Sequence, residues 1–168
     1  MASGFTASSM NYPLLAIPAY YIFSLTPHMY AFTVLKKAGY SPNNANPKAS
    51  TSPQLVKGKV PEEVWYKFQR AESAHSNCLE QMPLFATAVL SSLFAERVAP
   101  SIKIGGTTTL DPTGLSTYIA AFFAIRVAYT VAYVQITERK TSFVRSALWA
   151  AGLGLSIWQV VKAAKVLG

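Results

Sequence analysis

The chain has 168 residues, of which 51% are hydrophobic and only 13% are charged. A soluble domain has about twice that charged fraction, so the apolar residues must be gathered in long segments. The net charge of +8 does not indicate a nucleic-acid partner, because the basic residues lie between apolar segments and do not alternate with aromatic residues along a surface stripe.

The first apolar segment, residues 12–35, follows a small, polar tail at residues 1–11. It is long enough to cross a membrane, which takes about 20 mostly apolar residues. Pro18 and Pro27 lie within it and predict a bent helix, since membrane helices tolerate prolines where neighbours satisfy the freed carbonyls. No Lys or Arg precedes Lys36, so the segment lacks the basic start of a signal peptide and is expected to be permanent.

Residues 36–60 are rich in Pro, Asn and Ser and predict a coil loop. The second helix, residues 61–96, is predicted to begin at Pro61, because proline suits a first turn and the acids Glu62 and Glu63 suit the positive end of the helix dipole. Its first half is too polar to face lipid and must face protein or water.

A second loop, residues 97–114, leads to a third span at residues 115–137 and a fourth at residues 143–161, with a tail at residues 164–168. The prediction is an all-α integral membrane protein, a four-helix bundle in one domain of residues 12–163. Basic residues gather in or beside loops one and three, which places these loops in the cytoplasm. They are Lys36, Lys37, Lys48, Lys57, Lys59, Lys67, Arg70, Arg139, Lys140 and Arg145, against Arg97, Lys103, Lys162 and Lys165 on the other side.

The second and third helices carry polar residues at helical spacing within apolar sequence. These are Arg70, Asn77 and Glu80 on the second helix, and Arg126, Tyr129 and Tyr133 on the third. A lone charge near the bilayer centre costs roughly 2.5–3.5 kcal/mol, so Glu80 and Arg126 are expected to pair, within one chain or between subunits. The whole set predicts a polar cavity open to the cytoplasm for an anionic or zwitterionic ligand, with a purely structural charge pair as the alternative.

The two histidines and the single cysteine are expected to have no catalytic or metal-binding role. His75 projects away from the Arg70 face and is expected to contact a neighbouring subunit or to hydrogen-bond within the bundle. Cys78 is expected to be structural, in a buried and non-basic place. A metal site is not predicted, because the spacing of His28 and His75, the only histidines, fits no ligand pattern.

The string RAESAHSNCLEQMPLF, residues 70–85, resembles a signature of the membrane-associated proteins in eicosanoid and glutathione metabolism, the MAPEG family. That signature is approximately R-x-x-x-A-x-x-N-x-x-E-x-x-P. The strings NANPKAS, RVAYTVAYV and FVRSALWAAGL resemble the family's first cytoplasmic loop, its second signature and the start of its fourth helix. The four stretches occur in the family's order, and the resemblance covers residues 12–163.

The resemblance implies a homotrimer of four-helix subunits that binds glutathione between subunits near the cytoplasmic side. Its implied glutathione-binding residues are Arg70, Asn77, Glu80, Arg126, Tyr129 and Tyr133. Arg145, or in second place Arg139, would stabilise the glutathione thiolate, since a nearby cation lowers the pKa of a thiol and so increases the nucleophile present at neutral pH. The chain departs from some glutathione-using members at Ser73 and Ser76, where they have Arg, and at Gln81, where they have Tyr.

The resulting hypothesis is a glutathione-dependent transferase or peroxidase of the endoplasmic reticulum membrane, with glutathione as co-substrate. Its other substrate would be a lipophilic electrophile that partitions from membrane lipid. Two alternatives stay open: a glutathione-independent isomerase or cyclase of a hydrophobic metabolite, and a non-enzymatic lipid-binding or regulatory membrane subunit.

Overall fold

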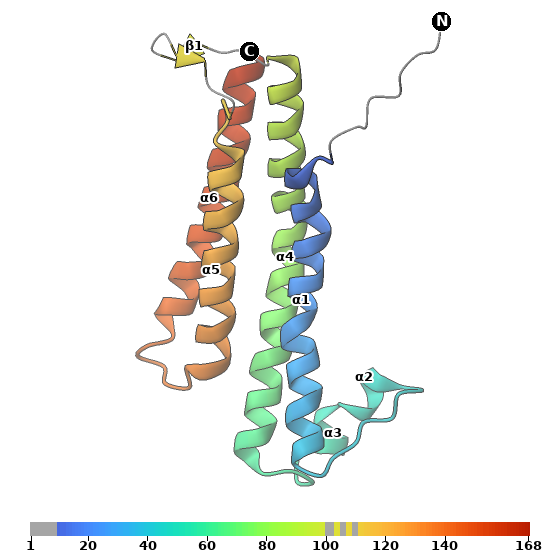
Figure 1. The fold of residues 1–168 in the computed structure, drawn as a ribbon. Helices are drawn as coiled ribbons and strands as arrows, with labels where there is room; N and C mark the ends of the chain where they lie inside the picture. Colours follow the sequence, from blue (N-terminus) through green and yellow to red (C-terminus); the bar gives the residue numbers. More distant parts are fainter. Residues whose placement is uncertain (1–9, 100–102, 105–106, 109–110) are drawn as a thin grey trace, which may run out of the picture.

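Four long helices make up most of the computed structural model, which describes residues 10–99, 103–104, 107–108 and 111–168 (Figure 1). They are α1 (Tyr12–Lys37), α4 (Glu62–Val98), α5 (Leu115–Gln135) and α6 (Phe143–Leu167). Between them lie the short helices α2 (Pro47–Ser50) and α3 (Pro53–Val56) and the two-residue strands β1 (Lys103–Ile104) and β2 (Thr107–Thr108). The strands pair antiparallel, so the helical prediction is confirmed for the long elements while the hairpin was not predicted.

α4 is the central helix of the fold. It packs against α1 along one side and against α5 and α6 along another, and α5 and α6 pack against each other (Figure 1). α4, α5 and α6 are each long and apolar enough to cross a membrane. α1 is not in this group although it has 26 residues, because its tyrosines and prolines lower its mean hydropathy; its crossing stays a prediction.

α1 continues without interruption through Pro18 and Pro27. Pro27 has no N–H to donate to the carbonyl of Phe23, one helical turn earlier. The hydroxyl of Thr26 donates to that carbonyl at 2.8 Å and so replaces the missing partner. This side-chain hydrogen bond allows an apolar helix to contain a proline without leaving a backbone carbonyl unpaired.

Several helix boundaries differ from the predicted ones. α6 continues to Leu167 and includes most of the predicted tail at residues 164–168, since Ala and Lys are strong helix formers and Ala163 is buried. α5 ends at Gln135, two residues before the predicted end. The predicted coil at residues 36–60 contains α2 and α3, each of which begins with proline in its first turn. The predicted tail at residues 1–11 lies mostly outside the described residues.

An aromatic cluster joins α1, α4 and α5 at the centre of the fold. Tyr20 is fully buried there, with ring centroids 5.0 Å from Phe85 and 5.1 Å from Phe122. Its hydroxyl donates to the backbone carbonyl of Cys78 at 2.9 Å. The cluster therefore positions the middle of α4, where the polar residues of the candidate site begin.

Removing the buried hydroxyl in Tyr20→Phe is expected to lower the free energy of unfolding by about 1 kcal/mol, because a buried hydrogen bond is lost while the ring packing stays. Thermal unfolding in detergent measures this. Tyr21→Phe is the matched control, since Tyr21 is exposed on the same helix and should leave the midpoint unchanged. Equal midpoints for both variants would show that the Tyr20 hydroxyl does not stabilise the α1–α4 contact.

Candidate functional site

Two pockets lie between α4, α5 and α6 at the end of the molecule where α5 connects to α6, and they share Tyr133 and Arg145 as lining residues. The small pocket has a volume of about 270 Å³ and is also lined by Asn77, Tyr129, Ser142, Ser146 and Trp149. The large pocket has a volume of about 550 Å³ and is also lined by Glu63, Tyr66, Gln69, Arg70, Ser73 and Thr137. Ligand pockets typically span about 300–1,000 Å³, so together the two are large enough for a small peptide.

Arg70 is held in the large pocket by the end of α5. Its Nε donates to the backbone carbonyl of Val134 at 3.0 Å. Val134 is in the last turn of α5, where carbonyls have no partner within the helix and attract cations. This bond occupies one nitrogen of the guanidinium, and the other two donate to no residue in the described ranges, which leaves them for a ligand.

Arg145 is brought to both pockets by the first turn of α6. It lies third in that helix, and its guanidinium carbon is 4.6 Å from the ring centroid of Tyr133. A guanidinium stacked on an aromatic ring has fewer rotamers to lose on binding an anion. Arg145 is therefore a positioned cation at the point where the two pockets meet.

Arg126 is fully buried below the small pocket. Its guanidinium carbon lies 4.2 Å from the ring centroid of Tyr129, which lines that pocket, and its Nη2 donates to Sγ of Cys78 at 3.1 Å. Its Nε and Nη1 have no hydrogen-bond partner among the described residues. The expectation of a non-basic setting for Cys78 is wrong, because Arg126 contacts the sulfur, whereas its burial is confirmed.

The predicted pairing of Glu80 with Arg126 does not occur within the chain. Glu80 is exposed on α4, and Arg126 faces Cys78 instead. Within the part of the chain that the structure describes, the side-chain contact that does form between an acid and a basic residue joins His28 to Glu72 at 2.7 Å. A contact between Glu80 and Arg126 of different subunits is still a prediction.

Glu80 and Arg139 are not among the residues that line the two pockets. Arg139 is exposed in the turn between α5 and α6. Of the two candidate catalytic residues, the geometry therefore favours Arg145.

Three α6 residues of the small pocket were missed by the sequence reasoning: Ser142, at the start of the helix, Ser146 and Trp149. They follow at intervals of four and three residues, which place them on the same helix face as Arg145. That spacing was a usable signal. It was overlooked because serine and tryptophan near a membrane surface are also common as packing or interface residues.

Gln81 joins α4 to α6 and does not line either pocket. It is buried, and its Nε2 donates to the backbone carbonyl of Trp149 at 3.2 Å. A Cβ placed on the buried Gly152 would lie 3.3 Å from Oε1 of Gln81. The close approach of α4 and α6 beside the small pocket therefore depends on the absence of a side chain at Gly152.

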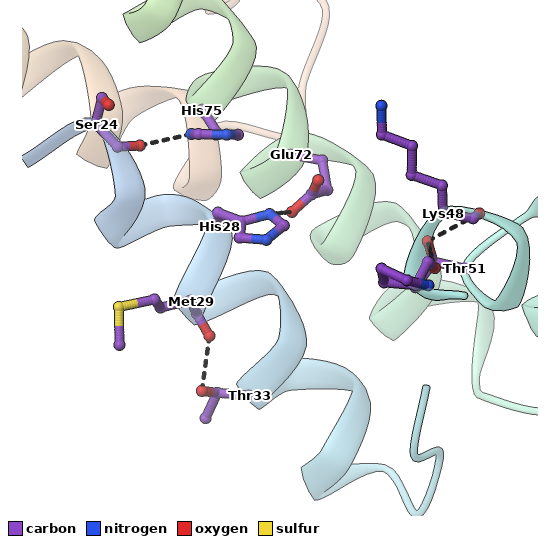
Figure 2. Close-up of polar contacts among 9 residues, drawn as sticks. Ser24, His28, Met29, Thr33, Lys48, Thr51, Glu72 and His75 are labelled. Atoms are coloured by element: carbon purple, nitrogen blue, oxygen red, sulfur yellow. Dashed lines mark hydrogen bonds and ion pairs between the residues drawn. The ribbon is translucent and has the colours of Figure 1, made fainter. Parts of the chain in front are cut away.

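A second polar cluster lies on the other side of α4, against α1 (Figure 2). Nδ1 of His28 is 2.7 Å from Oε1 of Glu72, and Nδ1 of His75 is 2.7 Å from the backbone carbonyl of Ser24. The two imidazole rings are 5.0 Å apart. Across the described ranges, no three His, Cys, Asp or Glu side chains are arranged to hold a metal ion. The cluster is thus a contact between two helices.

A scan against protein-family models finds the MAPEG family over residues 12–165. The chain belongs to the MAPEG family. A search of curated proteins and a search of solved structures each found no match. The resemblance inferred from four short motifs is confirmed over nearly the whole chain.

MAPEG membership and the three helices that can cross a membrane together make this an integral membrane protein of the eicosanoid and glutathione metabolism family. The MAPEG motif residues Arg70 and Asn77 on α4 line the two pockets, as do Tyr129 and Tyr133 on α5. The family pattern and the pockets therefore coincide on the α5 side of α4.

Proposed function

We propose that this MAPEG protein is a membrane-bound glutathione-dependent transferase or peroxidase that acts on lipophilic electrophiles. The observation that carries the proposal is the meeting of side chains from three helices at two adjoining pockets. They are Arg70 and Asn77 from α4, Tyr129 and Tyr133 from α5, and Arg145 from α6.

The chemistry of the pockets suits a peptide with two carboxylates, one ammonium and a thiol. Arg70 and Arg145 provide cations for carboxylate or thiolate groups, and Glu63 provides an anion for the ammonium. The side chain of Asn77 can both donate to and accept from a peptide group. Ser73 lines the large pocket where some relatives of this type have Arg, so the chain would hold the ligand with fewer cations.

In the proposed reaction, the glutathione thiolate attacks the electrophilic atom of the lipophilic substrate, and the electron pair of the broken bond leaves with the displaced group. Arg145 would stabilise the thiolate before the attack. A cation beside a thiol favours its ionised form and so raises the concentration of the nucleophile at neutral pH.

The exposed carboxylate of Glu80 supports assembly into the proposed homotrimer. Glu80 lies in the middle of α4, and among the described residues no cation pairs with it; a carboxylate facing lipid is costly. A neighbouring subunit that brings a cation or glutathione itself to Glu80 would remove this cost. Native mass spectrometry of the protein in detergent is the direct measurement of the trimer.

The proposed setting is the endoplasmic reticulum membrane, crossed four times, with the loops at residues 38–61 and 136–142 in the cytoplasm. Support for this orientation comes from the basic residues at these loops, among them Lys36 and Lys37 at the end of α1. Both pockets lie where α5 connects to α6, and this connection is at the same end of the bundle as the loop between α1 and α4 (Figure 1), where cytosolic glutathione would reach them.

The test is a calorimetric titration of the purified protein with glutathione, followed by an assay of conjugation to a generic electrophile. Asn77→Ala is expected to weaken glutathione binding at least about tenfold, because a side chain that bonds to a buried polar ligand contributes about 1.5 kcal/mol or more. Asn44→Ala, at an exposed loop position, is the matched control and should bind as the natural chain does.

Glu80→Ala separates a site within one subunit from a shared one, since Glu80 lines neither pocket of its own chain. Loss of binding in this variant would support a ligand held between subunits. If the natural chain binds no glutathione at millimolar concentration, the proposal is wrong, and the glutathione-independent or regulatory alternatives become the leading ones.

A further inference from the structure

A third pocket lies between the last turns of α1 and the first turns of α4, and Glu63 is the lining residue that it shares with the large pocket described above. Its volume is about 560 Å³. Its lining includes two basic residues, two residues with hydroxyl groups and two apolar residues: Lys37 and Lys67, Tyr30 and Thr33, and Val34 and Val64. We call it the α1–α4 pocket.

The charges of the α1–α4 pocket do not cancel. Lys37 and Lys67 bring two ammonium groups, and Glu63 on its rim brings one carboxylate, which leaves a net charge of +1. No ion pair joins Glu63 to either lysine in the described part of the chain. Lys37 is also the last residue of α1. The pocket therefore has cations free to bind an anion.

The α1–α4 pocket is charged near the loop end of α1 and more apolar farther into the helix, as is expected across the headgroup region of a bilayer. Lys37 lies at the loop end of α1, and Tyr30 lies two turns, or roughly 10 Å, farther into the helix. The ammonium of Lys67 lies 5.9 Å from the ring centroid of Tyr30. Tyrosines and lysines with this arrangement are typical of the headgroup level, where the aromatic ring lies deeper and the ammonium reaches toward water.

We propose that the α1–α4 pocket binds the headgroup of an anionic glycerophospholipid of the bilayer that surrounds the protein. The phosphodiester would lie near the ammonium groups of Lys37 and Lys67, and an acyl chain would descend along Val34 and the exposed apolar surface of α1. A lipid with one net negative charge neutralises the pocket. Basic pockets between membrane helices on the cytoplasmic side are a known form of anionic lipid recognition. This pocket adjoins the proposed glutathione site at Glu63, which lines both, and shares no other lining residue with it.

The experiment is native mass spectrometry of the full chain in detergent, titrated with phosphatidylserine or with phosphatidylcholine of the same acyl chains. The natural chain is expected to retain phosphatidylserine more strongly. The double variant Lys37→Gln/Lys67→Gln should weaken phosphatidylserine binding about 25-fold, from a factor of about five for each lysine. Lys48→Gln/Lys57→Gln, which makes the same change of charge at exposed loop positions, should bind within about twofold of the natural chain.

Three results would overturn the proposal. One is equal retention of the two lipids by the natural chain; this measurement does not depend on the folding of any variant. Another is equal loss of phosphatidylserine in the two double variants, which would place the effect in the general positive charge of the loop. The third is displacement of phosphatidylserine by about 10 mM inorganic phosphate, which would identify a free phosphate site. Lys37→Arg/Lys67→Arg should retain the lipid and so distinguishes lost charge from lost folding.

Discussion

Arg145→Ala is expected to lower the rate of glutathione conjugation by about 10²–10³-fold while it changes the dissociation constant of glutathione by no more than about threefold. The magnitude is that of removing one positioned group that stabilises charge at a reacting atom. The geometric reason is that Arg145 is stacked on Tyr133 where the small and large pockets meet. Calorimetry gives the binding, and initial rates at saturating glutathione give the turnover.

Two further variants make this expectation specific. Lys140→Ala removes an exposed cation near the same turn and should leave the rate unchanged. Arg139→Ala tests the second candidate, and a large loss of rate in it, with normal turnover in Arg145→Ala, would transfer the role to Arg139. Arg145→Lys should recover only part of the rate, because an ammonium cannot stack and donate as a guanidinium does.

Gly152→Leu is expected to destabilise the protein by about 1–3 kcal/mol, the usual cost of forcing extra atoms into a packed interior. The added side chain would meet Oε1 of Gln81 at its first carbon and Cδ of Arg126 close by. α6 must then move away from α4 and take Trp149 and Arg145 with it. Both the midpoint of thermal unfolding in detergent and the affinity for glutathione should fall.

Gly154→Leu is the matched control, since Gly154 is exposed on the same helix and a Cβ there meets nothing within 4 Å. It should be neutral in both measurements. If the two glycine variants unfold at the same temperature, the close contact at Gly152 does not hold α6 in place.

The three helices that can cross a membrane, α4, α5 and α6, were predictable from the sequence because hydropathy acts along the chain and needs no knowledge of packing. The end of α6 was not. The apolar run stops at Val161, and the prediction ended the helix there, whereas Lys162 and the alanines after it keep a helical backbone because Ala and Lys are strong helix formers. α2 and α3 were missed because a four-residue helix that begins with proline has the composition of a turn.

For the site, helical spacing predicted which residues share a face but not where that face points. Asn77 and Arg70 line the pockets, whereas Glu80 is exposed. Equal depth in the membrane suggested that Glu80 would pair with Arg126. The rotation of α4 about its axis, which the packing of Tyr20 and Phe85 sets, instead places Cys78 against Arg126. Such rotations depend on contacts between distant segments and cannot be deduced from spacing.

The length of α4 has a consequence for how the two proposed substrates would meet. Its 37 residues span roughly 55 Å, whereas the hydrocarbon core of a bilayer is about 30 Å thick. A membrane-spanning α4 would therefore extend beyond the hydrocarbon core into water. Glutathione would arrive by diffusion in three dimensions, and the lipophilic partner would arrive by diffusion in two. The concentration that governs the second encounter would then be moles per mole of lipid, and the protein would work as a catalyst at a phase boundary.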